Sequence, residues 1–474
     1  MLLSVLLSML LASCSGQELF CGILDLSAYG SVCGSCEYTM NDGTASVTER
    51  HFEKDGHTID SRLYEMPSQD IAFAASVRAE DAEEVLLLCF DRTAADLHWS
   101  DGTEWHETAD PEGSYDASCL FVDTEQENLL LYMPMAYAHI ENGCVRYLPD
   151  LKGYLDVTKN EDGSLHLELY ARGCGEEASS DFFLASCRDA ALDWSSEGVR
   201  GYWRPYTNDQ DGRFLYDGYY WITPETYEPH GEDVFANWVA SYFVKSFVYG
   251  SEYYDVMQPI RLFMIDTVIR NQNEAGFWPS NALSTWLQED YGIGPGYYDT
   301  RFNSDFADIL MKTVRDAGGE EILEALDRYC DFYVDFAGRE GWELGGGLAV
   351  PDYYFPGMKK PHMSLNHQLA ETEVLYQAAM LLDRSELTDL ADLLLAALEG
   401  TAEQWIMPDG NLEYAIYPDG QFGGKDYPYL TYDDLYNTQA LLESMGRERS
   451  ESLQLLMDSK QQWMDRNGIT GYKR

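Results

Sequence analysis

Aromatic side chains recur beside carboxylate, amide, guanidinium and imidazole groups in six short segments of the C-terminal half. These segments are residues 276–279, 295–301, 352–356, 364–367, 412–414 and 426–432. Exposed aromatic rings stack on the apolar faces of sugar rings, while Asp, Asn, Arg and His bind sugar hydroxyls. One tyrosine taken alone is more often a core residue with a satisfied hydroxyl. Six such segments in one half of the chain favour a carbohydrate-binding site.

Over about residues 270–445, the order of these segments is similar to that of the motifs in a known family. The motifs, in chain order, are Trp278-Pro279, Pro295-Gly296-Tyr297-Tyr298, Asp352-Tyr353-Tyr354-Phe355-Pro356, Leu365-Asn366, Leu412-Glu413-Tyr414, and Asp426-Tyr427 ahead of Thr431, Leu435 and Gln439. In this order they resemble the C-terminal region of D-glucuronyl C5-epimerases. The resemblance implies a helical toroid and epimerisation at C5 of a uronic acid within a glycan chain.

The implied reaction removes a proton next to a carboxylate and returns one to the opposite face of the ring. Two acid or base groups must therefore flank the sugar. In the family these groups are tyrosines, which correspond here to Tyr354 (or alternatively Tyr353), Tyr414 and Tyr427. A phenol is a poor base at neutral pH unless a cation favours the phenolate, and Arg301 and Lys425 are the candidate cations. The implied substrate-binding residues are Trp278, Tyr298, Asp299, Arg301, Tyr353, Asn366, His367, Lys425 and Asp426.

Two other functions remain open from the residues alone. A glycoside hydrolase or polysaccharide lyase can occupy the same kind of toroid, because one fold hosts several chemistries. A hydrolase needs two carboxylates that flank the bond, and the candidates are Asp299, Asp352, Glu371, Glu413 and Asp426. A non-catalytic glycan-binding envelope protein would keep the aromatic segments without the acid and base groups.

Apolar periodicity predicts the elements that must position these segments. Between residues 36 and 187, short apolar runs alternate with Asp-Gly and Asn-Gly turn signals, which is typical of an antiparallel sandwich or barrel. From Glu232 onward the period becomes helical, and Val234, Trp238 and Tyr242 would share one face. Further helices are expected near 256–271, 306–314, 322–336, 365–382, 386–405, 431–445 and 450–465. Eight helices linked by short turns can form four antiparallel hairpins that close into a ring.

The fold class predicted from these patterns is a multidomain α+β protein. A β-rich sandwich or barrel is expected over residues 36–200, and an all-α (α/α) toroid of helical hairpins over 201–474. The loops at one rim of such a toroid would carry the aromatic segments.

The N-terminus predicts export. An apolar run ends in Leu11-Ala12-Ser13 before Cys14, the small-residue pattern that precedes the lipid-modified cysteine of bacterial lipoproteins. The run is shorter than the ~20 residues that span a bilayer, although a transmembrane anchor and plain secretion are the alternatives. We therefore expect a signal peptide over 1–13, lipidation of Cys14, a linker over 14–35, and a location in the bacterial cell envelope.

Charge and cysteine content limit the partners. The net charge of −51 is spread over both halves and repels phosphate backbones and anionic head groups. We expect a glycan partner, no nucleic acid, and membrane contact only through the lipid anchor; the oligomeric state stays open. The ten cysteines favour a disulfide in the N-terminal region, with Cys33 and Cys36 as a redox or metal pair in the alternative. Residues 208–212 lack the distal Glu of a calcium loop, so we predict no metal. We also expect no cofactor.

Overall fold

The computed structural model describes residues 32–40, 45–54, 57–80, 84–101, 103–124, 127–175, 177–188, 192–207, 211–237 and 242–473. The predicted signal peptide, Cys14 and nearly all of the predicted linker lie outside the described residues, as does Trp238. The chain divides into two compact units. One, called the β unit here, comprises Met1–Val239 with Phe243–Thr267, and the other, the helical unit, comprises Ala240–Tyr242 with Val268–Arg474.

The β unit contains two antiparallel sheets. Along the larger sheet the order is β1 (Val32–Met40), β2 (Ala45–Lys54), β3 (His57–Glu65), β4 (Ile71–Arg78), β14 (Ala178–Cys187), β10 (Asn128–His139), β11 (Cys144–Tyr147), β18 (Val234–Ala236), β16 (Gly218–Ile222) and β15 (Gly212–Leu215). Beside β10 this sheet continues into β9 (Cys119–Asp123), β6 (Asp96–Ser100) and β7 (Trp105–Thr108). The smaller sheet has the order β5 (Glu84–Arg92), β13 (Leu165–Arg172), β12 (Tyr154–Lys159) and β8 (Gly113–Tyr115).

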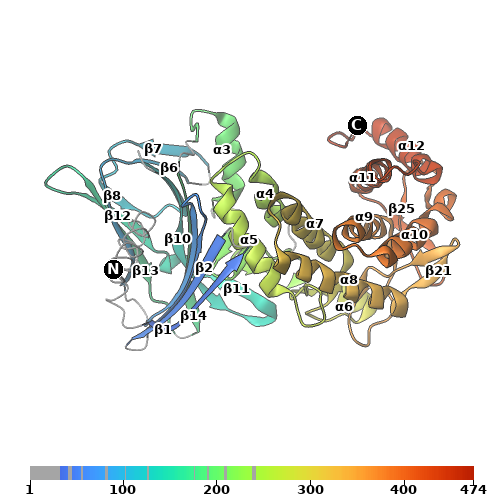
Figure 1. The fold of residues 1–474 in the computed structure, drawn as a ribbon, viewed down its shortest axis with the longest axis horizontal. Coiled ribbons are helices and arrows are strands. Elements are labelled where there is room, and N and C mark those ends of the chain that lie inside the picture. Colours follow the sequence, from blue (N-terminus) through green and yellow to red (C-terminus); the bar gives the residue numbers. More distant parts are fainter. Residues whose placement is uncertain are drawn as a thin grey trace, which may run out of the picture. The chain divides into compact units, whose positions relative to one another are not determined.

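The two sheets share one hydrophobic core. Burial alternates along β13, so that Leu167 and Leu169 point inward while His166 and Glu168 point outward. The inward residues of both sheets form a single cluster that includes Leu167, Leu131 and Phe182. Figure 1 shows the two sheets facing each other. The predicted combination of a β-rich part with a helical part is therefore confirmed.

The β unit extends further along the chain than the boundary predicted at residue 200. β15, β16 and β18 belong to the larger sheet, and Val234 pairs with Arg146 of β11. The predicted helical period at Val234 is therefore wrong, because three apolar residues at helical spacing are too few to distinguish a helix from a strand. The β unit also contains α3 (Glu197–Trp203), β17 (Tyr227–Glu228), most of α4 (Tyr242–Gly250) and α5 (Met257–Asn271) as far as Thr267.

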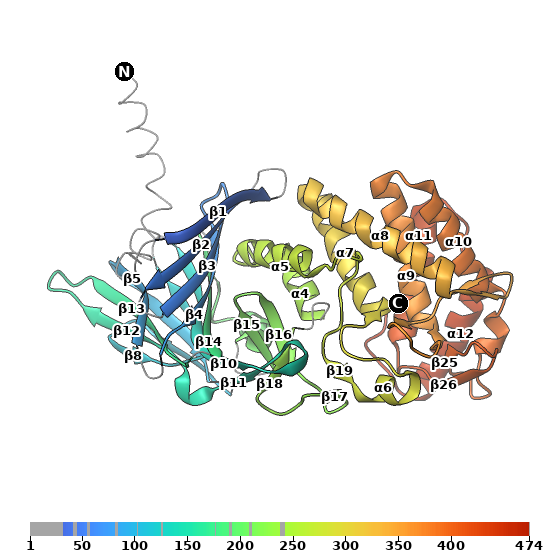
Figure 2. The ribbon, with the colours of Figure 1, turned by 90° about the horizontal axis from the view of Figure 1, so that it is seen from below.

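Six long helices form three hairpins in the helical unit. They are α7 (Thr300–Ala317) with α8 (Glu320–Glu340), α9 (Leu365–Leu382) with α10 (Ser385–Glu399), and α11 (Leu430–Ser444) with α12 (Glu451–Arg466). The link between α7 and α8 is only Gly318-Gly319, both with positive φ, so the helices pair antiparallel. α7, α9 and α11 pack side by side in one row (Figures 1 and 2). The fourth predicted hairpin corresponds to α4 and α5, which group mainly with the β unit.

The helices α7, α9 and α11 begin at one rim, where the longer connections form small sheets. β20 (Tyr298–Asp299) pairs with β23 (Tyr353–Tyr354), and β24 (Met363–Ser364) pairs with β25 (Glu413–Ile416), which pairs with β26 (Phe422–Lys425). The remaining elements are β19 (Leu283–Ser284), α6 (Thr285–Tyr291), β21 (Trp342–Leu344) and β22 (Gly347–Ala349). These sheets connect the predicted aromatic segments to the starts of the helices.

Two further expectations concern the membrane and the cysteines. In the ranges that the structure describes, no helix combines the length and apolarity that crossing a membrane requires. The cysteines whose side chains the structure describes form no disulfide with one another, so the predicted disulfide does not form among these cysteines, and Cys36 forms none with Cys33. Residues three apart in the strand β1 lie about 10 Å apart, beyond the roughly 7 Å Cα separation that a disulfide allows.

Candidate active site

Three aspartates lie at the starts of the neighbouring helices α7, α9 and α11. Asp299 is the N-cap residue of α7, where its carboxylate accepts a backbone hydrogen bond. Asp352 accepts a 2.8 Å hydrogen bond from the backbone N–H of Ser364, the residue before α9. Asp426 accepts a 2.5 Å hydrogen bond from the hydroxyl of Thr431 in the first turn of α11. Because helix N-termini favour negative charge, this rim gathers carboxylates that are distant in the sequence.

Asp352 lies fully buried between two imidazoles. Its Oδ2 atom is 3.4 Å from Nε2 of His362 and 3.6 Å from Nδ1 of His367. His362 is also hydrogen-bonded through Nδ1 to the hydroxyl of Tyr291 at 2.7 Å. His367 Nδ1 is 2.5 Å from the hydroxyl of Thr300. The hydrogen bonds to Tyr291 and Thr300 orient the two rings beside the carboxyl group, while Oδ2 of Asp352 and Nε2 of His362 have no hydrogen-bond partner in the described part of the chain.

Burial controls the protonation of this group. It lowers the pKa of His362 to about 4, and it lowers the pKa of His367 well below the ordinary value, with Arg301 adding to the effect. Burial raises the pKa of Asp352 well above its usual range and that of Asp299 to about 7. Burial therefore favours the neutral forms of both imidazoles and of the Asp352 carboxyl group, which places candidate proton acceptors beside a candidate proton donor.

Tyr353, Tyr414 and Tyr427 surround the imidazoles. The ring of Tyr353 lies 5.8 Å from the rings of both His362 and His367. The ring of Tyr414 lies 5.6 Å from that of His362 and 5.8 Å from that of Tyr427. Tyr427 is 45% exposed and Tyr414 is half-buried, so the cluster reaches the surface at Tyr427.

Tyr354 is not part of this cluster. Adjacent residues of a strand point to opposite faces, so Tyr353 and Tyr354 diverge along β23. The Tyr354 ring lies 5.7 Å from the ring of Phe336 and beneath the guanidinium of Arg339 at 5.2 Å. Of the two alternatives that the family resemblance leaves open, Tyr353 is the one that lies near the imidazoles.

The expected cations are bound elsewhere. Arg301 forms a 2.8 Å ion pair with Asp434, and the ammonium of Lys425 lies 5.5 Å from the ring centre of Trp463. Arg301 also donates to the backbone carbonyl of Asn366 at 3.3 Å. Arg301 therefore joins the start of α7 to Asn366 of α9 and Asp434 of α11.

The phenols of the cluster are protonated at neutral pH. Burial raises the pKa of Tyr353, Tyr414 and Tyr427, and the nearby aspartates raise it further. The expectation that a cation favours a phenolate here is therefore wrong. These tyrosines can donate protons and hydrogen bonds, and the bases of the site are the imidazoles.

Trp278 and Tyr298, predicted to contact substrate, are core residues. Trp278 is 1% exposed, and its indole N–H donates to the carbonyl of Val268 at 2.8 Å. Tyr298 is fully buried, and its hydroxyl is hydrogen-bonded to Tyr329 at 3.0 Å and donates to Glu371 at 3.4 Å. Their spacing in the sequence matches that in the family, but their rings lie inside the helical core.

Asp426, also predicted to bind substrate, is part of a buried ion pair. Its Oδ2 atom is 2.6 Å from the ammonium of Lys460. Lys460 also donates to the carbonyl of Tyr427 at 2.6 Å and to the side chain of Asn411 at 2.7 Å. The pair therefore holds the backbone of Tyr427 in position.

Two exposed aromatic residues beside His362 were not predicted. The ring of Trp286 stacks at 24° to that of His362 with a centroid distance of 6.4 Å, and Tyr417 lies 5.7 Å from it. Trp286 is 36% and Tyr417 38% exposed. His362 and Tyr291 were also missed, since neither belongs to a motif. The one available signal is that His362 and His367 stand five residues apart in a chain with nine histidines.

Several buried oxygen atoms at or near the site lack a hydrogen bond within the described part of the chain. They include Oδ2 of Asp352, Oδ1 of Asn366 and Oε2 of Glu371. Native proteins seldom leave buried polar atoms unpaired. These atoms are therefore positions where water or a ligand hydroxyl can bind.

The β unit has a separate pocket with a volume of about 430 Å³. Its lining includes the rings of Trp99 and Tyr115, which meet edge to face at 5.5 Å. Asp101, Asp116 and Lys152 add polar groups to it. The pocket has the composition of a sugar-binding surface, but it lacks histidine among its lining residues.

No protein-family model matches the chain, and no curated protein matches its sequence. Among solved structures, it is similar to a family 76 glycoside hydrolase from a bovine Bacteroides thetaiotaomicron strain, with 8% identity over 92% of this chain and 78% of that chain and a TM-score of 0.39.

Two other solved structures are similar over about half of the chain. Cellobiose 2-epimerase from Spirochaeta thermophila has 14% identity over 49% of this chain and 61% of that chain, with a TM-score of 0.35. Unsaturated glucuronyl hydrolase from Bacillus sp. GL1 has 11% identity over 50% and 62%, with a TM-score of 0.34. The chain spans less than two thirds of these two proteins. All three TM-scores are too low to transfer a site or an activity, and none of the three is a C5-epimerase.

Proposed function

We propose that the helical unit is the catalytic part of a carbohydrate-active enzyme that transfers protons at a ring carbon of a uronic-acid-containing glycan. The observation that carries this proposal is the position of Asp352 between the neutral imidazoles of His362 and His367, with Tyr353 and Tyr414 beside them. Proton transfer at carbon needs a base and an acid that are both close to the substrate.

In this mechanism His367 removes the proton next to the substrate carboxylate. This step requires the tautomer in which Nδ1–H donates to the hydroxyl of Thr300, so that Nε2 is the basic atom. Tyr414 then donates a proton to the opposite face, and Tyr427 reprotonates Tyr414 from the solvent side. Hydrogen bonds from buried donors such as the carboxyl group of Asp352 would stabilise the enolate-like intermediate. The tyrosines thus act as acids, whereas the family resemblance alone suggested a tyrosine base.

The exposed rings of Trp286, Tyr417 and Tyr427 give a sugar chain an apolar surface beside the imidazoles. A closed α/α toroid, lipidation of Cys14 and a location in the cell envelope are parts of this proposal that rest on the sequence.

Incubation of the purified protein with a glucuronate-containing polysaccharide in deuterated water tests the proposal. We expect deuterium at C5, detected by NMR of the recovered sugar. His367→Gln and Tyr414→Phe should each slow incorporation by about 10²- to 10⁴-fold. The matched control Tyr354→Phe should change it less than about twofold, since that ring lies away from the imidazoles. Absence of deuterium in the wild-type reaction, or an unchanged rate in His367→Gln, would refute the mechanism.

A hydrolase is the second candidate because two buried carboxyl groups adjoin each other. Asp299 and Tyr353 are register partners, and Asp299 contributes to the raised pKa of Asp352. A pair of carboxyl groups, one of them protonated, is the requirement for glycoside hydrolysis. New reducing ends without deuterium at C5 would favour this reaction.

A binding protein that uses the pocket of the β unit would give a third result. The wild type would bind glycan without converting it, and Trp99→Ala would lose that binding.

A further inference from the structure

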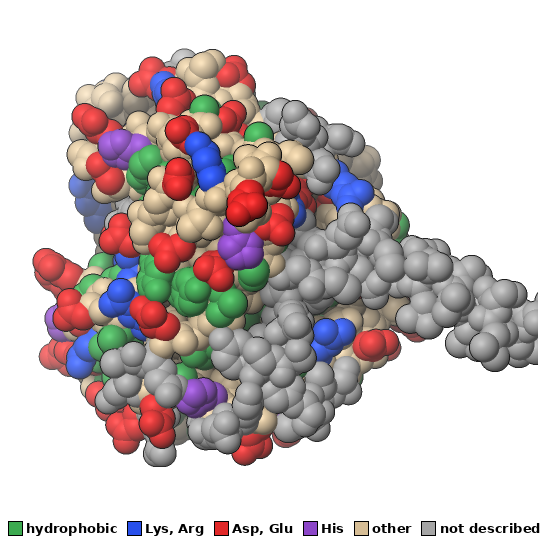
Figure 3. Space-filling model, turned by 90° about the vertical axis from the view of Figure 1, so that its left-hand side faces the viewer, with side chains coloured by type: hydrophobic (Ala, Val, Ile, Leu, Met, Phe, Trp, Pro, Cys, Tyr) green, Lys and Arg blue, Asp and Glu red, His purple; other side chains and the backbone are tan. Residues whose placement is uncertain are grey.

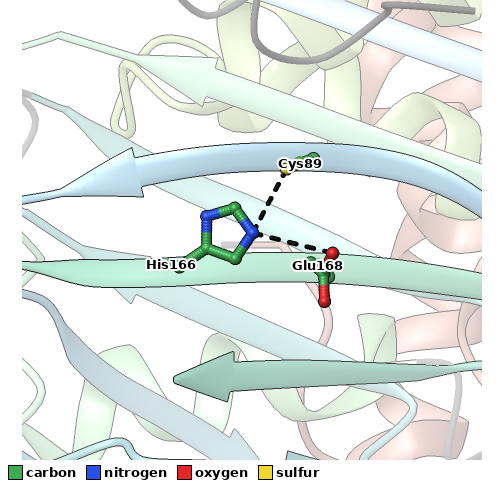
Figure 4. Close-up of side chains that lie close together, drawn as sticks. All are labelled: Cys89, His166 and Glu168. Atoms are coloured by element: carbon green, nitrogen blue, oxygen red, sulfur yellow. Dashed lines mark hydrogen bonds and ion pairs between the residues drawn. The ribbon is translucent and has the colours of Figure 1, made fainter. Parts of the chain in front are cut away.

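A cysteine, a histidine and a glutamate converge on the outer face of the smaller sheet in the β unit. His166 and Glu168 are two residues apart on β13, so both point outward. In the register of β13 with β5, Cys89 lies opposite Glu168, and Asp91 lies opposite His166. Figure 4 shows the three side chains turned toward one another across the two strands.

The distances among these groups match those around a tetrahedral metal ion. Nε2 of His166 is 3.4 Å from Sγ of Cys89 and 3.6 Å from Oε1 of Glu168. Bonds to zinc of about 2.0–2.3 Å at tetrahedral angles place neighbouring ligand atoms about 3.3–3.6 Å apart. All three ligand atoms lie within 4.8 Å of one another. The Sγ atom of Cys89 and the carboxylate of Glu168 must come within the same range of about 3.3–3.6 Å for one ion to bind both.

The histidine is already oriented as in a metal site. Its Nδ1 atom is 2.8 Å from the carboxylate of Asp91, which also accepts a 3.2 Å hydrogen bond from the side chain of Asn160. A carboxylate on one ring nitrogen of a histidine fixes the tautomer and presents the other nitrogen to a metal. Asp91 thereby leaves the lone pair of Nε2 facing Cys89 and Glu168.

The charge on this face also favours a cation. Asp156 lies directly opposite Glu168 in the register of β12 with β13. Like charges directly opposite each other destabilise a sheet. Within the described ranges, no Lys or Arg forms an ion pair with Asp156, Glu168 or Asp91. Figure 3, which shows the side where β8, β12 and β13 lie in Figure 1, has acidic side chains spread over its coloured surface.

We propose that Cys89, His166 and Glu168 bind a zinc ion, with Asp91 as the carboxylate that orients His166. A thiolate, an imidazole and a carboxylate are all ligands that zinc accepts, and the thiolate disfavours the harder ions Mg²⁺ and Ca²⁺. Three protein ligands leave one coordination position for water or for the carboxylate of Asp156. The sequence offers no motif for this site, because Cys89 and His166 meet only through strand pairing. The proposal is independent of the catalytic site in the helical unit.

Zinc titration of the chelator-treated full-length protein tests the proposal. We expect one zinc ion per chain by mass spectrometry of the metal content, and a thiolate-to-metal absorption band when Co²⁺ replaces Zn²⁺. Cys89→Ser should abolish the band and weaken zinc binding by at least about 100-fold, as should His166→Gln. Asp91→Asn should weaken it by about 10- to 100-fold, the usual effect of removing the group that orients a ligand.

Two control variants locate the ion. Cys36→Ser removes an exposed thiol and the Cys33–Cys36 pair, and His106→Gln removes an exposed histidine that also bonds to an aspartate. Both should bind zinc as the wild type does. Circular dichroism of the metal-free Cys89→Ser protein should match that of the wild type, because Cys89 is only partly buried. Failure of the wild type to bind zinc, binding that survives Cys89→Ser, or loss of binding in Cys36→Ser would overturn the proposal.

Discussion

Replacement of Lys460 by methionine should destabilise the helical unit strongly. The side chains of Lys460 and Asp426 are 0% and 1% exposed, and their charged atoms are 2.6 Å apart. All three ammonium protons of Lys460 have acceptors, since Asn411 and the carbonyl of Tyr427 take the other two. Methionine has a similar volume but no donor.

The size of the effect follows from the burial of the pair. Burial is the main influence on both partners, raising the pKa of Asp426 and lowering that of Lys460 in spite of their attraction. The loss of one partner leaves a buried charge without compensation, which costs about 3–5 kcal/mol. For a unit of this size each kcal/mol lowers Tm by about 2–4 °C, so we expect a decrease of roughly 6–20 °C.

A double variant separates charge from packing. Lys460→Met with Asp426→Leu removes both charges, and an apolar pair of similar volume is often as stable as a buried ion pair. We therefore expect the double variant to recover most of the stability that Lys460→Met loses. Both variants also lose the hydrogen bond from Lys460 to the carbonyl of Tyr427. We therefore expect both to catalyse deuterium incorporation at C5 of the substrate more slowly than the wild type.

Urea denaturation followed by circular dichroism measures these free energies of unfolding. The control is Arg449→Met, which breaks a 3.3 Å ion pair with Glu443 whose side chains are 43% and 52% exposed, and which should cost less than about 1 kcal/mol. A loss of less than about 1 kcal/mol in Lys460→Met, or a double variant no more stable than the single one, would show that the reasoning about burial is wrong.

Two other predictions follow from burial in the helical unit. Trp278→Ala should cost about 3–5 kcal/mol of stability because the ring is in the core, whereas Trp286→Ala should change stability by less than about 0.5 kcal/mol and weaken glycan binding in a titration. Burial raises the pKa of Glu371 and of Glu373 to about 8, so the folded chain holds protons that the unfolded chain releases near pH 4.5. The stability that these two glutamates contribute is complete below pH 4.5 and is lost as the pH rises through 8. The pKa of His362 is lowered to about 4, so this residue makes stability increase with pH, but only below pH 6.5. We expect Tm to fall between pH 6.5 and 8.5, and to fall less in Glu371→Gln; a Tm that rises over this range in calorimetry contradicts the argument.

Local sequence patterns determined most of the helices. The prediction of a helix over 365–382 coincides with α9, and the helix expected near 256–271 is α5 (Met257–Asn271). Apolar periodicity over 15 or more residues is a local property, and tertiary contacts seldom override it. The aromatic segments were expected in loops at one rim, and residues 295–301, 364–367 and 426–432 include the starts of α7, α9 and α11.

Side-chain orientation and long-range partners were decided only by the tertiary structure. Tyr353 and Tyr354 are equivalent in the sequence, and the pairing of β20 with β23 places Tyr353 beside the imidazoles. Asp352 contacts His362 and His367 because the chain between them folds back onto the start of α9, and no local pattern in the sequence predicts this fold. The same reason applies to Cys89 and His166, which meet through the register of two strands. Spacing along the chain indicates candidates, but burial and register determine which of them can do chemistry.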